Sequence, residues 1–182
     1  LISLAGALIL IGIVTFIWGF IADAERTWAN YLLNNYLFLS LAIGGTFWLA
    51  LQRITQSGWS SAFIRIPEAF ANYIPAAAVF FLLMWVGFYH LYEWTHTHVV
   101  EHDPVLQHKT PYLNVPFFMI RLLIFFAVWI IMTQLLRRVS KQEDATDGML
   151  PFEKNEWYSK VYIFLLALTF SLASFDWIMS IE

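Results

Sequence analysis

The chain has 182 residues, of which 60% are hydrophobic and 13% are charged, and its mean hydropathy is +0.64. Because roughly 25% of the residues of a soluble domain are charged, this composition argues against an ordinary soluble protein and favours a lipid bilayer as the solvent. The net charge is −3 and the ten Lys and Arg residues are scattered, which argues against a nucleic-acid partner. The absence of cysteine excludes disulfides, thiolate zinc sites, cysteine-ligated iron–sulfur clusters and covalent c-type haem within these residues.

Five apolar stretches are long enough to cross a membrane, since a spanning helix needs about 20 mostly apolar residues. They cover residues 1–22, 31–51, 74–92, 115–136 and 161–181. This pattern predicts an all-α integral membrane protein with one transmembrane domain over residues 1–182. We expect the chain to be part of a longer protein, because it starts without Met and its last apolar stretch runs to the end.

The basic residues of the connecting segments predict the orientation, because cytoplasmic loops carry an excess of Lys and Arg. The loops after the second and fourth stretches hold seven of them: Arg53, Arg65, Arg137, Arg138, Lys141, Lys154 and Lys160. The loops after the first and third stretches hold two, Arg26 and Lys109. We therefore expect a cytoplasmic N-terminus and an outward-facing His-rich segment at residues 93–114.

Two charged residues, Arg121 and Asp176, lie inside predicted spans. Each costs roughly 2.5–3.5 kcal/mol to insert at the bilayer centre on translocon scales, so such groups need a partner or a water-filled cavity. At a rise of about 1.5 Å per residue, they share the outer third of the bilayer with His90. We expect Arg121 and Asp176 to pair in a polar cavity near the outer surface.

Further polar side chains are expected at this level. Asn34 and Asn35 approach it from the second span, and Glu93 follows His90 by one helical turn. Histidine titrates near neutral pH, so His90 and Glu93 are candidates for proton exchange. The whole group suits a proton exit path or contacts to a quinol headgroup, and the alternative is a static ion pair that holds helices together.

Polar groups outside the spans allow two more predictions. The segment Arg65-Ile-Pro67-Glu68 suits a short interfacial helix, in which Glu68 takes up protons from the cytoplasm or forms a cap or loop ion pair. The outer segment contains His96, His98, Glu101, His102, Asp103 and His108. We expect it to be a hydrated loop without a bound metal, because no pair of histidines lies beside a third ligand on a clearly predicted helix.

Four longer strings resemble one family of membrane proteins. They are Asn34-Asn-Tyr-Leu-Phe-Leu-Ser-Leu-Ala-Ile-Gly-Gly-Thr-Phe-Trp-Leu-Ala-Leu-Gln52, Gly58-Trp-Ser with Arg65-Ile-Pro-Glu68, Tyr112-Leu-Asn-Val-Pro-Phe-Phe-Met-Ile-Arg121, and Ser174-Phe-Asp-Trp-Ile-Met-Ser-Ile-Glu182. The family is the NrfD/polysulfide-reductase-like membrane subunits. Within it the chain, from about residue 28 to residue 182, is most similar to the ActF-type subunits of bacterial alternative complex III.

This resemblance implies a larger protein of two four-helix bundles, of which these residues supply one bundle and one further helix. It implies a respiratory complex of the bacterial inner membrane that oxidises quinol and reduces cytochrome c or an oxidase. The expected partners are lipid, a sister NrfD-like subunit, and c-type cytochrome and iron–sulfur subunits. The haem c groups and clusters belong to those subunits, and this chain binds no cofactor of its own. The His-rich segment is then periplasmic.

The family implies a proton-conducting half-channel in this subunit and assigns quinone binding more firmly to the sister subunit. Carried over by motif, Arg121 and Asp176 are its best site residues, and the chain borders a quinol site at most. The chain is then not catalytic alone. Two alternatives remain open: a structural scaffold of the complex, and a stand-alone secondary transporter, which would favour broken spans around a midplane site.

Overall fold

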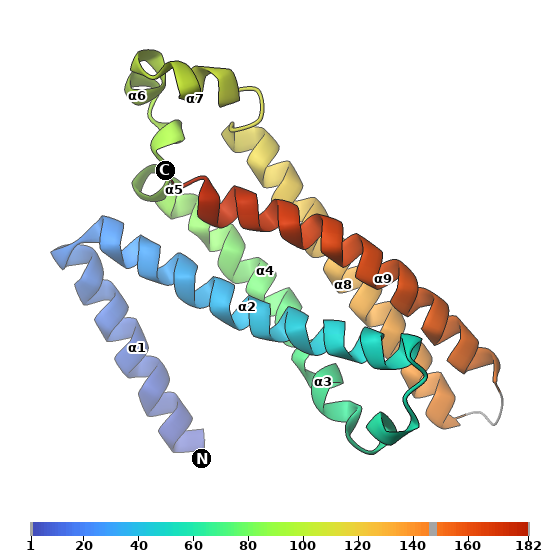
Figure 1. Cartoon of the computed structure of the whole chain (residues 1–182). Coiled ribbons are helices and arrows are strands. Elements are labelled where there is room, and N and C mark those ends of the chain that lie inside the picture. Colours follow the sequence, from blue (N-terminus) through green and yellow to red (C-terminus); the bar gives the residue numbers. More distant parts are fainter. Residues whose placement is uncertain (1, 146–148, 182) are drawn as a thin grey trace.

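The computed structural model describes residues 2–145 and 149–181, and within these ranges every regular element is a helix (Figure 1). Five helical segments are long and apolar enough to cross a membrane: Ser3–Ala22, Ala24–Ile54, Arg65–Leu91, Val115–Ala145 and Leu150–Met179. The predicted all-α membrane class is confirmed.

The longest helices are α1 (Ile2–Ala22), α2 (Ala24–Ile54), α8 (Val115–Ala145) and α9 (Leu150–Ser174). Three of them extend beyond the apolar stretches that predicted them, because the backbone stays hydrogen-bonded after the side chains become polar. Helix α2 begins seven residues before position 31, and α8 continues nine residues beyond position 136. The polar extensions carry charged residues into contact with other helices at the bundle ends.

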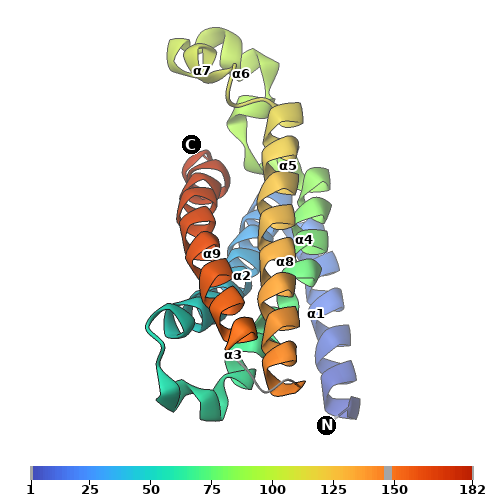
Figure 2. The ribbon, with the colours of Figure 1, turned by 90° about the vertical axis from the view of Figure 1, so that its right-hand side faces the viewer.

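Helices α2, α4 (Tyr73–Leu83), α8 and α9 form a four-helix bundle, in which α2 and α8 each pack against both α4 and α9. Helix α1 packs mainly against α2, which it meets at its own C-terminal end, and it diverges from α2 toward its N-terminal end (Figures 1 and 2). Most of its side chains are exposed, which in this chain means facing lipid or another protein. The core between the four helices is aromatic and aliphatic, with Phe81, Trp129 and Trp177 fully buried.

The turn from α1 to α2 is held by a helix cap and an aromatic cluster. Asp23 caps α2 by accepting a hydrogen bond from the backbone nitrogen of Arg26 at 3.0 Å. The rings of Phe16 and Phe20 contact Trp28 edge to face, with centroids 6.3 and 5.1 Å away. A sharp turn without a long loop therefore fixes where α1 meets the bundle.

The third membrane segment is interrupted rather than continuous. It consists of α3 (Arg65–Phe70), α4, a 3₁₀ turn η2 (Met84–Gly87) and α5 (Phe88–Leu91). Gly87 lies directly against the indole of Trp28, and an added Cβ would clash with the ring. The missing side chain thus allows α2 to approach the interruption, and α3 is the short helix expected around Glu68.

The remaining segments are short helices at the two ends of the bundle. The 3₁₀ helix η1 (Gly58–Phe63) precedes α3. At the opposite end, which we call the outer end, lie η3 (Glu93–Thr95), α6 (Thr97–His102) and α7 (Pro104–Lys109), where the sequence led us to expect a loop. Helix α9 finishes in one π-helical turn, η4 (Phe175–Met179), which places the C-terminal end of the chain beside α5 (Figure 1).

Candidate functional site

The most unusual polar feature of the bundle is an ion pair between α8 and the π-helical turn that ends α9. Arg121 Nε donates to Asp176 Oδ2 at 2.6 Å, and Arg121 Nη2 donates to Asp176 Oδ1 at 3.1 Å. The two side chains are 8% and 1% exposed, respectively. Two parallel bonds between a guanidinium and a carboxylate form the strongest common type of ion pair. The structure therefore brings together two predicted residues that lie 55 positions apart.

The loop before α8 completes the surroundings of the guanidinium. Arg121 Nη1 donates to the carbonyl oxygen of Tyr112 at 3.0 Å. The guanidinium carbon lies 3.9 Å from the centre of the Tyr112 ring and 4.4 Å from that of Phe117. Partial burial and the neighbouring Asp176 carboxylate raise the pKa of the Tyr112 hydroxyl above its ordinary value. The Tyr112 hydroxyl is therefore a weaker acid beside the pair than a tyrosine in water.

Beneath the pair, aromatic rings close the bundle interior. The Trp177 ring lies 4.4 Å from Phe81 and stacks on Phe126 at 5.7 Å. The Tyr92 hydroxyl donates to the carbonyl oxygen of Trp177 at 3.1 Å. The indole nitrogen of Trp177 is buried and has no hydrogen-bond partner among the described residues. The charges of Arg121 and Asp176 are consequently separated from the rest of the core by an apolar layer.

His90 and Glu93 lie in a different environment from the buried pair. Both side chains are exposed, and both line a cavity of about 400 Å³ shared with Glu25, Tyr92 and Ile181. The cavity lies at the outer end, where two groups able to exchange protons face the same space. The structure places these residues beside each other, as the sequence led us to expect, but outside the buried layer of the ion pair.

Asn34 and Asn35 are not part of this group. Asn34 Nδ2 donates to the carbonyl oxygen of Asn30, and Asn35 Nδ2 donates to that of Tyr31, each at 2.8 Å. Within the described part of the chain, the hydrogen bonds of both amides stay on α2. The carbonyl four residues earlier is the nearest acceptor for a short amide on a helix, and the structure shows no hydrogen bond from these amides to Arg121 or Asp176 among the described residues.

The histidines of the outer segment include one pair at helical spacing. His98 and His102 lie on α6 with ring centroids 4.7 Å apart, and His102 Nδ1 bonds the carbonyl oxygen of His98. Over residues 2–145 and 149–181, no three His, Asp or Glu side chains are grouped closely enough to hold a metal ion.

Glu68 lies at the opposite end of the bundle, in a network of charged groups. It is 5% exposed and pairs with Arg65, while its other oxygen, Oε1, is buried without a hydrogen-bond partner among the described residues. Arg65 also pairs with Asp144, and Arg53 Nη2 lies 2.6 Å from Glu143 Oε2. Glu68 faces a cavity of about 360 Å³ whose lining includes Arg65 and Asp144.

The sequence interpretation did not identify Arg53, Glu143 and Asp144 as partners. The available signal was that acidic residues follow the fourth apolar stretch on the side where the basic residues of the loops gather. That signal does not predict which acidic residue pairs with which basic residue, because the partners lie on three different helices: α2, α3 and the polar end of α8.

Three pairs of hydrogen-bonded side chains, each with at least one hydroxyl, lie in the interior between the two charged ends. Tyr36 bonds Ser174 at 2.9 Å, Trp129 donates to Thr169 at 2.8 Å, and Thr46 bonds Tyr162 at 2.6 Å. Each pair joins α9 to α2 or α8. These pairs could not be recognised from the sequence, since Ser, Thr and Tyr are common in apolar helices and commonly form hydrogen bonds with their own backbone.

The arrangement therefore has a buried charge pair with an accessible cavity nearby at one end, a buried carboxyl at the other, and separated hydroxyls between them. Thr169 and Tyr162, whose hydroxyls belong to two of these pairs, are about 10 Å apart along the axis of α9, so a proton that moves from one hydroxyl to the other requires water between them.

Comparison with known proteins adds no further information: no protein-family model and no curated protein matches this chain.

Proposed function

We propose that this chain is a membrane subunit of a quinol-oxidising respiratory complex in the bacterial inner membrane, and that it contributes a proton-conducting half-channel. Arg121 and Asp176 form the outer end of that path, and Glu68 is the uptake group on the cytoplasmic side. His90 and Glu93 lead protons to the periplasm. The electron-carrying haem c and iron–sulfur groups belong to partner subunits, and a sister subunit of the same fold holds most of the quinol site.

The observation that carries this proposal is the buried pair itself. Two of the strings that resemble the NrfD-like family, the one ending at Arg121 and the one beginning at Ser174, meet in a single bidentate contact. Measured polar contacts between membrane helices average under about 1 kcal/mol, which is a weak reason to bury two charges. A functional need to hold charge at this depth supplies a stronger one.

The test is the Asp176→Asn variant in the intact complex, reconstituted in vesicles with a pH-sensitive dye. Because Asn cannot carry the charge or the proton, the protons released per quinol should fall to those that quinol oxidation itself liberates. The matched control is Asp103→Asn, which changes the same group at the same end, where Asp103 caps α7. Asn caps a helix as well as Asp, so this variant should keep the original ratio.

A structural role is the second candidate, and one observation favours it. Each of the three nitrogens of Arg121 already donates a hydrogen bond, to Asp176 or to the Tyr112 carbonyl. A scaffold of this kind predicts that Arg121→Leu lowers the amount of assembled complex but leaves turnover per complex unchanged. Normal assembly of Asp176→Asn with unchanged proton release would reject the half-channel and leave the scaffold.

A further inference from the structure

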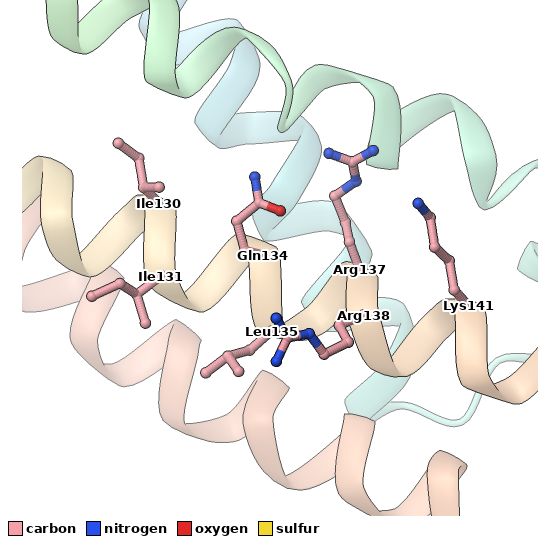
Figure 3. A pocket seen from close by; sticks show the side chains of 7 residues that line it. All are labelled: Ile130, Ile131, Gln134, Leu135, Arg137, Arg138 and Lys141. Carbon is pink, nitrogen blue, oxygen red and sulfur yellow. The ribbon is translucent and has the colours of Figure 1, made fainter.

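One face of α8 carries a hollow of about 520 Å³ near the end that holds the basic residues. We call it the α8 basic groove, and its lining residues are Ile130, Ile131, Gln134, Leu135, Arg137, Arg138 and Lys141. All seven come from α8. Figure 3 shows Gln134, Arg137 and Lys141 extending to the same side of the helix, with Arg138 lying beside Leu135.

The lining changes character along the helix axis. Its first part, with Ile130, Ile131 and Leu135, is aliphatic, and its last part is formed by three cations. The predicted span ends at residue 136, so the aliphatic part lies at hydrocarbon depth and the cations lie at the level of the lipid headgroups. From Leu135 to Lys141 the helix rises about 9 Å, which is comparable with the headgroup layer. The groove thus changes from apolar to cationic along its length, in the same order as a phospholipid changes from acyl chain to phosphate.

None of the three cations of the groove forms an ion pair in the described part of the chain, although Arg137 and Lys141 also line the neighbouring cavity that holds Glu68 and Asp144. The nearby acidic residues of α8, Glu143 and Asp144, are paired with Arg53 and Arg65 on other helices. Arg137 donates one hydrogen bond to the neutral side chain of Asn72. That bond holds the guanidinium at the edge of the groove without neutralising its charge.

We propose that the α8 basic groove binds an anionic phospholipid of the surrounding membrane. Arg138, which lies beside Leu135, contacts the phosphate, Arg137 and Lys141 add positive charge from the adjoining side of the helix, and one acyl chain lies along Ile130, Ile131 and Leu135. Guanidinium and ammonium groups together suit a phosphodiester, and basic pockets at this depth are typical sites for acidic headgroups. A zwitterionic lipid is disfavoured because its own cation would face three others. The proposal is independent of any role in proton transfer.

The test measures lipid binding to the intact protein in detergent by native mass spectrometry. Phosphatidylglycerol should bind with a higher affinity than phosphatidylcholine. Each basic residue near an acidic headgroup contributes about fivefold in affinity, so Arg138→Gln with Lys141→Gln should weaken phosphatidylglycerol binding about 25-fold. Arg138→Lys, which keeps the charge, should bind almost as well as the original protein. Equal thermal unfolding of all variants shows that the fold is intact.

Lys154→Gln is the matched control, since Lys154 is exposed at the same end of the bundle on α9 but lies outside the groove. It should change the affinity by less than about twofold. A loss per charge equal to that of the groove variants would show a diffuse surface potential and overturn the proposal. Displacement of the lipid by millimolar inorganic phosphate would reveal a simple anion site and do the same. A photo-crosslinker at Gln134 should capture lipid, and capture of polypeptide in its place would mean that a protein covers the groove.

Discussion

Arg121 combines three kinds of contact on one side chain. Its guanidinium forms two bonds with Asp176, a third with the Tyr112 carbonyl, and a stack against the Tyr112 ring. Each contact compensates part of the cost of removing the charge from water, and no single one is sufficient. The pair is therefore a matched unit, in which the loss of one member leaves the other buried and uncompensated.

The stability of single and double variants tests this coupling. Asp176→Leu leaves the Arg121 charge without its partner, so it should lower the free energy of unfolding by about 3–5 kcal/mol. Arg121→Met combined with Asp176→Leu removes both charges and should recover most of that loss. Thermal unfolding in detergent, followed by circular dichroism, measures both effects. Additive losses in the double variant would show that the two residues stabilise the bundle independently.

At the scale of elements, the contact between α2 and α3 depends on which of two adjacent glycines of α2 faces α3. Gly44 and Gly45 are adjacent on α2, and the sequence suggests only that this region packs closely. In the structure a Cβ on Gly45 would lie 2.9 Å from Cβ of Phe70 on α3, whereas a Cβ on Gly44 would meet nothing within 4 Å. Only one of the two glycines therefore supports the packing of α3 against α2.

The two glycines form a matched pair of variants. Gly45→Ala should destabilise the protein by about 1–3 kcal/mol, because the new methyl group pushes Phe70 and α3 away from α2. Gly44→Ala should be neutral or stabilising by up to about 1 kcal/mol, since Ala is the better helix former. The comparison uses the midpoint of thermal unfolding in one detergent. If both variants behaved alike, the position of α3 on α2 would be incorrect.

The interruption of the third span shows what an element prediction omits. Hydropathy over residues 74–92 is continuous, so it predicts one uninterrupted helix. The structure has a 3₁₀ turn at Met84–Gly87, and Trp28 packs against its last residue, Gly87. Likewise, nothing in the string around Asp176 indicates a π-helical turn, yet that turn carries the carboxylate toward Arg121.

At the scale of the whole molecule, charged groups gather at the two ends of an apolar bundle. The network of Arg53, Arg65 and Glu68 lies at one end, while the Arg121–Asp176 pair and the short helices α6 and α7 lie toward the other. The arrangement suits a protein whose ends face water and whose middle faces lipid. The direction in which it crosses the membrane remains a prediction from the loop charges.

Cysteine labelling tests that direction, because these 182 residues contain no cysteine. Glu101→Cys on α6 and Lys154→Cys on α9 are at exposed positions near opposite ends of the bundle. A membrane-impermeant maleimide added to spheroplasts, whose inner membrane is intact, should label residue 101 and leave residue 154 unlabelled. Detergent should make both accessible. The reverse pattern would show that the N-terminus faces outward.

The sequence by itself determined the class of the protein and predicted which charged residues lie at a common depth. Hydrophobicity and length decide whether a segment enters a bilayer, and a fixed rise per residue converts position into depth. On that basis Arg121 and Asp176 were predicted to pair, and they do. Depth alone also suggested Asn34 and Asn35, which bond their own helix in the structure.

Only the tertiary structure decided which groups at one depth face each other. That outcome depends on the rotation and close approach of each helix, which are set by contacts such as Trp28 against Gly87 and Phe70 against Gly45. These contacts join residues far apart in the chain, so local pattern does not encode them. The same applies to Glu68, Arg65 and Asp144, whose meeting requires α3 and the polar end of α8 to lie side by side.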